Sequence, residues 1–153
     1  MDDQLKRVFA QLRRHYDFAE VDFSDINACA TDGDNGLHHV VRWGDVAAAK
    51  ALIDAGIDIN KAGDLCYTPL HVACMKGNLE MVKLLVSRGA DIFALDEGSP
   101  PFTSARFAKQ DQICEFLGRL MKEAQSEDPK IRLRSRLTQL QREIASLKAQ
   151  LDG

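Results

Sequence analysis

The sequence predicts an all-α fold in which short helix pairs stack into a solenoid. A spacing of 33 residues recurs along the chain, relating Leu37 to Leu70 and Gly44 to Gly77. Aromatic residues make up only 7% of the 153 residues and Gly plus Pro total 14, which disfavours a turn-rich β-sandwich. Each unit carries apolar residues at helical spacing, and a single helix pair cannot bury its apolar faces alone. We therefore expect neighbouring units to stack.

The N-terminal segment, residues 1–29, is expected to form a cap helix followed by an irregular connection. Apolar residues follow one another at intervals typical of one helix face. This face is expected to cover the first repeat. Its members are Leu5, Val8, Phe9, Leu12 and Tyr16.

The middle unit, residues 63–94, shows why each repeat folds as a helix pair. It opens with the segment Thr68-Pro69-Leu70-His71-Val72-Ala73. Thr68 is a suitable helix cap, and Pro69 suits the first turn, where its missing N–H is not needed. Gly77 is able to adopt the left-handed conformation that ends a short helix, and Gly89 is expected to end the second helix. A less regular unit precedes it at residues 30–62.

These units resemble the ankyrin repeat family over residues 30–122. The resemblance is strongest in the middle unit, and the third unit, residues 95–123, departs from the pattern. There Pro100 replaces the capping Thr, Thr103 replaces His, and Lys109 stands where the family has a glycine between the helices. The third unit is therefore expected to be a C-terminal cap. The resemblance also implies that His38 and His71 are structural and hold adjacent turns together.

In the ankyrin architecture, turn tips and the outer face of each first helix line a concave surface that binds partners. Aromatic, Met and Arg residues, which are enriched in interface hot spots, recur at these positions, together with five carboxylates. The resemblance thus implies a protein partner with a basic patch. The alternative is that Trp43 and Phe107 pack against flanking helices. The positions carried over are Asp32, Asp34, Arg42, Trp43, Asp64, Leu65, Tyr67, Met75, Lys76, Asp96, Glu97, Ser99 and Phe107.

A heptad pattern marks the C-terminal segment, residues 130–153, after a polar linker at residues 124–129. The spacing predicts an amphipathic helix with a coiled-coil-like seam. Glu143 and Lys148 fall at positions where they could pair between parallel chains. Self-association is one interpretation; the others are that the helix folds back onto its own chain or meets a partner helix. The seam comprises Leu133, Leu137, Leu140, Ile144, Leu147 and Leu151.

Charge is unevenly distributed along the chain. Residues 129–153 carry six cations and two anions, whereas residues 1–128 carry fourteen cations and twenty-one anions. The overall net charge of −3 therefore hides an acidic body and a basic tail. The cations of residues 130–136 alternate, so they do not share one helix face, and no aromatic residues lie between them. Nucleic-acid binding is not expected.

The sequence offers little catalytic chemistry. It contains no CxxC pair, no HExxH, no GxSxG and no GxxxxGK[ST] motif. We expect no enzyme activity, no cofactor and no metal site. The acidic N-terminus is not followed by the apolar run of a secretory signal, and no apolar stretch is long enough to cross a membrane. A cytoplasmic protein without a membrane segment is expected.

The expected function is therefore non-catalytic protein binding. Small ankyrin proteins of this form resemble bacterial ones, some of which act as inhibitors or immunity proteins. This resemblance implies that the acidic concave face covers a basic toxin or enzyme. The alternative is a regulatory adaptor or scaffold that oligomerises through its C-terminal helix.

Overall fold

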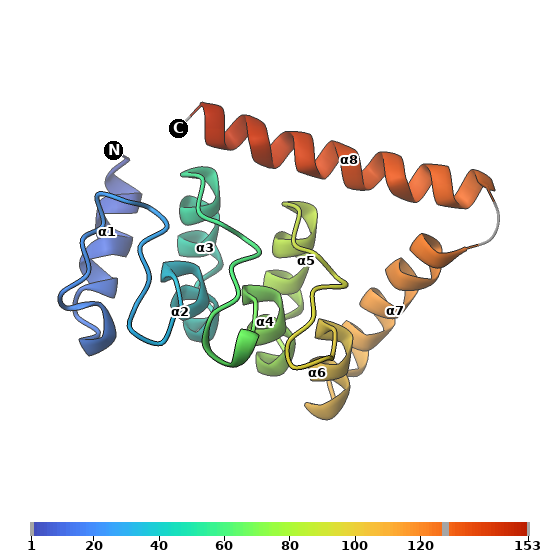
Figure 1. The fold of residues 1–153 in the computed structure, drawn as a ribbon, viewed down its shortest axis with the longest axis horizontal. Coiled ribbons are helices and arrows are strands. Elements are labelled where there is room, and N and C mark those ends of the chain that lie inside the picture. Colours follow the sequence, from blue (N-terminus) through green and yellow to red (C-terminus); the bar gives the residue numbers. More distant parts are fainter. Residues whose placement is uncertain (1, 127–128, 153) are drawn as a thin grey trace.

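The computed structural model describes residues 2–126 and 129–152, and the predicted all-α solenoid is confirmed there. Figure 1 shows helix pairs standing side by side, with a long C-terminal helix running along one side of the row. An isolated antiparallel bridge joins Cys29 and Asn35. The α-helices and two 3-10 turns (η) are α1 (Asp3–Leu12), η1 (Tyr16–Phe18), α2 (Gly36–Trp43), α3 (Val46–Asp54), η2 (Asp64–Cys66), α4 (Pro69–Lys76), α5 (Leu79–Ser87), α6 (Pro101–Phe107), α7 (Asp111–Gln125) and α8 (Pro129–Leu151).

The core runs continuously through three helix pairs. Helices α2 and α3, α4 and α5, and α6 and α7 pack as pairs, and the first helices also pack against one another in the order α2, α4, α6. Leu37 and Leu70 occupy equivalent positions in successive units and are both buried. The burial of such equivalent side chains between neighbouring units is what holds a repeat stack together.

Helix α1 caps the stack by packing against α3. Val8, Phe9 and Leu12 of the expected apolar face are buried. Tyr16 was expected on the same face, but its exposed fraction is 84%. The difference arises because α1 ends at Leu12 and the chain turns into η1, which breaks the helical spacing before Tyr16.

Local sequence signals set the ends of the short helices. The Asn35 side chain caps α2 by accepting the backbone N–H groups of Leu37 and His38 at 3.1 and 3.3 Å. Gly44 and Gly77 end α2 and α4 with φ of 76° and 71°, in the left-handed region expected for helix-ending glycines. Lys109 takes the equivalent place after α6 with φ of 56°, although left-handed backbone is unfavourable for a residue with a Cβ.

Two buried histidines tie each first helix to the following turn. The Nδ1 of His38 accepts the backbone N–H of Asn35 at 3.1 Å, and its Nε2 lies 2.9 Å from the Tyr67 carbonyl oxygen. His71 repeats the arrangement with Thr68 and the Ser99 carbonyl oxygen, at 3.2 and 3.1 Å. These bonds agree with the structural role that the family resemblance implied for both histidines.

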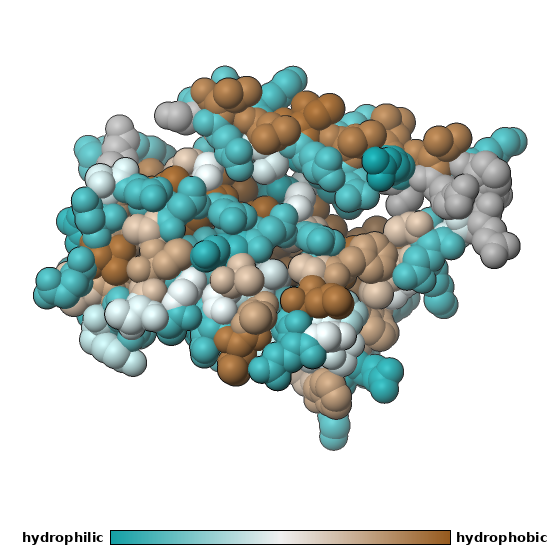
Figure 2. Space-filling model, in the orientation of Figure 1, coloured by the Kyte–Doolittle hydropathy of each residue, from teal (hydrophilic) through white to brown (hydrophobic). Residues whose placement is uncertain are grey.

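Helix α8 folds back along the stack and contacts α3 and α7. Among the α8 side chains that the structure describes, the half-buried ones are Thr138, Arg142, Ser146 and Ala149, so a mostly polar face lies toward the repeats. The heptad seam points away from them, and its six side chains are exposed by 41 to 85%. Figure 2 shows this seam as a hydrophobic row along the upper edge of the molecule. Helix α8 therefore folds back onto its own chain, which was one of the three interpretations of the heptad pattern. The face that contacts the repeats is, however, opposite to the apolar seam.

The linker expected at residues 124–129 is shorter in the structure. Helix α7 continues through Gln125, and Pro129 is already part of α8. Residues 127 and 128 of that expected linker lie outside the described residues.

Candidate protein-binding face

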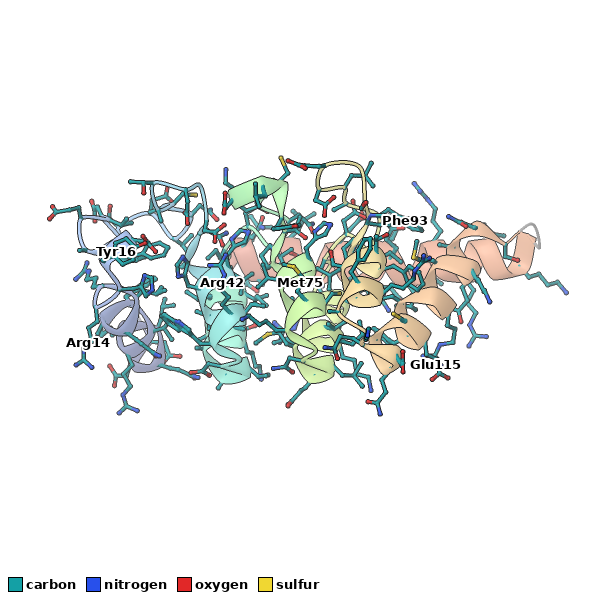
Figure 3. The ribbon with its side chains drawn as sticks, turned by 90° about the horizontal axis from the view of Figure 1, so that it is seen from below. Arg14, Tyr16, Arg42, Met75, Phe93 and Glu115 are labelled. Carbon is teal, nitrogen blue, oxygen red and sulfur yellow. The ribbon has the colours of Figure 1, made fainter. Side chains whose placement is uncertain are left out.

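An exposed residue recurs near the end of each first helix. Arg42 of α2, Met75 of α4 and Phe107 of α6 follow one another by 33 and 32 residues, and all three are exposed. Figure 3 shows Arg42 and Met75 on adjacent helices of one view. We use the name binding face for the exposed residues at the ends of these helices and at the neighbouring turn tips. They are Asp32, Arg42, Trp43, Asp64, Leu65, Met75, Lys76, Glu97 and Phe107.

Large apolar side chains are exposed on the binding face. The exposed fractions are 38% for Trp43, 37% for Met75, 56% for Leu65 and 83% for Phe107. Leu65 and Cys66 have φ of 52° and 61°, a left-handed turn that places both side chains at an exposed tip. Exposed apolar residues that gather on one face are typical of an interaction site.

Trp43 and Phe107 differ in how far they pack against their surroundings. The Trp43 ring centre lies 6.3 Å from that of His39 and 6.4 Å from that of His15, so it partly covers the N-terminal segment. Phe107 is almost fully exposed. The alternative in which both residues pack against flanking segments therefore applies in part to Trp43 and is wrong for Phe107.

Three of the five expected tip carboxylates are exposed: Asp32, Asp64 and Glu97. Asp96 is half-buried, because one oxygen accepts the Ser99 backbone N–H at 3.0 Å and the other lies 4.0 Å from the His71 Nε2. The acidic part of the binding face is therefore smaller than the sequence suggested.

Asp34 is a correction to the sequence interpretation, which placed it at an exposed turn tip. Its exposed fraction is 1%. One carboxylate oxygen accepts a hydrogen bond from Arg42 at 2.7 Å, and the other accepts the Asp64 backbone N–H at 2.9 Å. Burial acts to raise the pKa of Asp34, but these bonds and the nearby charges of His38 and Arg42 hold it below its ordinary value. Asp34 joins successive turns, and it engages the Arg42 guanidinium.

The remaining expected residues divide by exposure. Tyr67 is half-buried, with its ring centre 5.8 Å from that of His71, while Lys76 is exposed at the end of α4. Ser99 is half-buried in the turn before α6.

Three exposed apolar residues were missed by the sequence reasoning. Tyr16, Phe93 and Leu95 are exposed by 84, 39 and 59%. Figure 3 shows Tyr16 toward the N-terminal end of the same view and Phe93 beyond Met75. Tyr16 was missed because the helical spacing assigned it to the core. Phe93 and Leu95 lie in a turn where spacing carries no face signal.

Cys74, His38 and His71 are buried within the repeats. Burial raises the pKa of the Cys74 thiol to about 12, which keeps it protonated and unreactive at neutral pH. The nitrogens of His38 and His71 bond to backbone, as given above. His39 differs, since its Nε2 is buried without a hydrogen-bond partner. None of the described helices combines the length and hydropathy needed to cross a bilayer.

Comparison with known proteins identifies the repeats. A family model described as "Ankyrin repeats (3 copies)" matches residues 6–96. Similar relatives include serine/threonine-protein kinase 12 of Arabidopsis thaliana, 38% identical over 87 residues, which are 56% of this chain and 19% of the relative. Human protein phosphatase 1 regulatory subunit 27 is 38% identical over 66 residues, 42% of this chain and 43% of the relative.

The relatives share the repeat segment and differ beyond it. Palmitoyltransferase AKR1 of Debaryomyces hansenii is 37% identical over 71 residues, 46% of this chain and 9% of that protein. This chain thus spans less than half the length of each of these relatives. Ankyrin repeats are generally non-catalytic interaction modules, although some relatives that carry them are enzymes. Three stacked helix pairs, two bridging histidines and the match over residues 6–96 together place this chain in the ankyrin repeat family.

Proposed function

We propose that this chain binds a partner protein through the binding face and that the partner presents a patch rich in Lys or Arg. The observation that carries the proposal is the exposure of Met75 and Phe107, two apolar side chains at equivalent positions of successive repeats. Ankyrin repeats imply a protein–protein interaction module. The proposal assigns that interaction to one face and one partner chemistry.

Charge complementarity supports the basic partner. Asp32, Asp64 and Glu97 are exposed at successive turn tips, and Arg42 is paired with Asp34. An apolar centre bordered by exposed carboxylates fits an apolar surface bordered by cations. Rim charges of this kind act mainly on association rate and specificity, whereas buried aromatic and Met side chains supply most of the affinity.

The biological role proposed is inhibition: the face covers a basic enzyme or toxin, as an immunity protein does. A non-catalytic module is the form such an inhibitor takes, since covering a site requires shape and charge alone. The name of one relative, protein phosphatase 1 regulatory subunit 27, describes a regulatory subunit of an enzyme and is compatible with this role. A regulatory adaptor is the alternative.

The test compares capture by matched variants. The wild-type chain, the double variant Met75→Ala/Phe107→Ala and the control Arg119→Ala, which changes an exposed residue of α7, are used to capture proteins from native lysate. A protein retained by the wild type and Arg119→Ala but lost by the double variant supports the binding face. A partner kept by all three would contradict it. A captured enzyme whose activity falls on binding supports inhibition; a signalling or transcription subunit supports the adaptor.

A scaffold role through α8 is a second candidate, favoured by the outward-facing seam. Leu140 and Ile144 lie at its centre and are exposed by 41 and 52%. We propose that a second copy of the chain covers this seam, since an a/d row next to solvent is what a coiled coil buries. Light scattering of the full chain and of the variant Leu140→Glu/Ile144→Glu tests this. A dimer that becomes monomeric in the variant supports it, and a monomeric wild type at high concentration contradicts it.

A further inference from the structure

Two histidines far apart in the sequence meet at the junction between the N-terminal segment and the first repeat. His15 directly precedes η1, Asp17 lies within η1, and His39 lies on α2. The His15 Nδ1 is 3.1 Å from an Asp17 carboxylate oxygen. The ring centres of His15 and His39 are 5.0 Å apart. One donor atom from each of the three side chains lies within 4.8 Å of the other two.

The His39 imidazole, which belongs to this cluster, has an unpartnered nitrogen. His39 is 3% exposed, and its Nε2 has no hydrogen-bond partner. An Asp34 carboxylate oxygen lies 3.9 Å from this nitrogen, too far for a hydrogen bond. A buried polar atom left without a partner is unfavourable and calls for an explanation. His38 and His71, by contrast, use Nε2 to reach a backbone carbonyl.

We infer that His15, Asp17 and His39 bind a divalent transition-metal ion, with Zn²⁺ as the best match to two imidazole nitrogens and one carboxylate. Zinc binds these groups at about 2.0–2.2 Å and adopts tetrahedral coordination, with water in a fourth position where only three side chains bind. Tetrahedral donors at such lengths lie roughly 3.3 Å apart. The His15–Asp17 pair already has that spacing, whereas the His39 donor lies within 4.8 Å of both and has to move closer when the ion binds.

The surroundings favour this set over its neighbour. Asp32, Asp34 and His39 also place donor atoms within 4.8 Å of one another. Both oxygens of Asp34, however, are engaged by Arg42 and by the Asp64 backbone N–H. His15 is partly exposed, which gives an ion a path to the site. The Phe18 ring packs edge-on against His39, with ring centres 4.7 Å apart.

The ion would join η1 to α2, two elements that residues 19–35 separate in the sequence. Because the Trp43 ring lies next to both histidines, bound metal would fix the N-terminal edge of the binding face.

The experiment titrates the full chain after treatment with a chelator. A Cys66→Ser background removes the exposed thiol as a competing ligand. Co²⁺ is added and visible absorption is recorded, and Zn²⁺ affinity is measured by competition with a chromophoric chelator. Expected results are one ion per chain and a higher midpoint of thermal unfolding with Zn²⁺. His15→Ala and Asp17→Asn should each weaken Zn²⁺ binding by more than tenfold, since even residues that only support a ligand contribute 10–100-fold.

The control variant is Asp22→Asn, an exposed aspartate of the same N-terminal segment. It should leave Zn²⁺ affinity unchanged, and circular dichroism should show that all variants keep the helical fold. The inference is overturned if the chain takes up no Co²⁺ or Zn²⁺, or if His15→Ala and Asp17→Asn bind as well as the parent chain. It is also overturned if Asp32→Asn abolishes binding while His15→Ala retains it, because the ion then occupies the neighbouring set.

Discussion

Replacement of Asp34 by Ala is expected to destabilise the fold strongly, although the sequence alone would class this residue as a surface carboxylate. The substitution removes the acceptor for the Asp64 backbone N–H and for the Arg42 guanidinium, at 2.9 and 2.7 Å. Hydrogen bonds to charged groups contribute about 1.5–3 kcal/mol each. The Arg42 side chain is 36% exposed and can bind water in the variant, so the loss of its hydrogen bond is taken at the lower end of this energy range. We therefore expect a loss of about 2–4 kcal/mol in the free energy of unfolding.

Urea denaturation followed by far-UV circular dichroism at pH 7 measures this loss. With a urea dependence of about 2 kcal/mol per molar, the unfolding midpoint should fall by roughly 1–2 M. Glu97→Ala is the matched control, because it removes an exposed tip carboxylate and should stay within about 0.5 kcal/mol of the wild type.

A double-mutant cycle separates the two bonds of Asp34. Arg42→Ala alone should be milder than Asp34→Ala, and the pair should be non-additive because both changes remove the same ion pair. If Asp34→Ala lowers stability no more than Glu97→Ala does, the carboxylate does not join the turns. The reasoning from its burial would then be refuted.

Three further predictions concern stability. Burial lowers the pKa of His71, so the folded state prefers the neutral ring. The free energy of unfolding should therefore be constant above the unfolded-state pKa of about 6.5 and decrease as the pH drops below it. For this residue the decrease is at most about 1.4 kcal/mol per pH unit. An NMR titration midpoint of His71 above 6.5 would contradict this. Lys109→Gly should raise the free energy of unfolding by about 0.5–1 kcal/mol, because φ of 56° strains a residue with a Cβ; a decrease in urea midpoint would argue against strain there. Phe107→Ala should change stability by less than about 0.5 kcal/mol, since the ring is 83% exposed, and a larger loss would place it in the core.

The repeats could be predicted from the sequence because their signals are local and recur. Gly77 ends α4 because glycine adopts positive φ without strain, and this freedom does not depend on contacts with distant residues. The spacing of Leu37 and Leu70 likewise identifies a core position in each unit. The histidine bridges followed from the family resemblance, and the structure supplies the carbonyl that each one reaches.

The candidate sites depended more on contacts between distant segments. The family resemblance placed Asp34 at an exposed turn tip, but Arg42 and the backbone of the next turn close over it and bury it. Periodicity placed Tyr16 in the core, but α1 ends four residues earlier. Nothing in the spacing of His15 and His39 indicated that they meet, because the connection between α1 and α2 is irregular and its path is set by packing.

By itself, the sequence determined the helix pairs, their caps, the residues at their core and the apolar seam of the last helix. These follow from backbone preferences and from hydrophobic periodicity, both of which act over a few residues. Only the tertiary structure decided which face of α8 lies against the repeats, which carboxylates remain exposed and which donors gather around His39. A heptad pattern defines a shared face but not the neighbour that covers it, because that choice depends on surfaces brought together by folding.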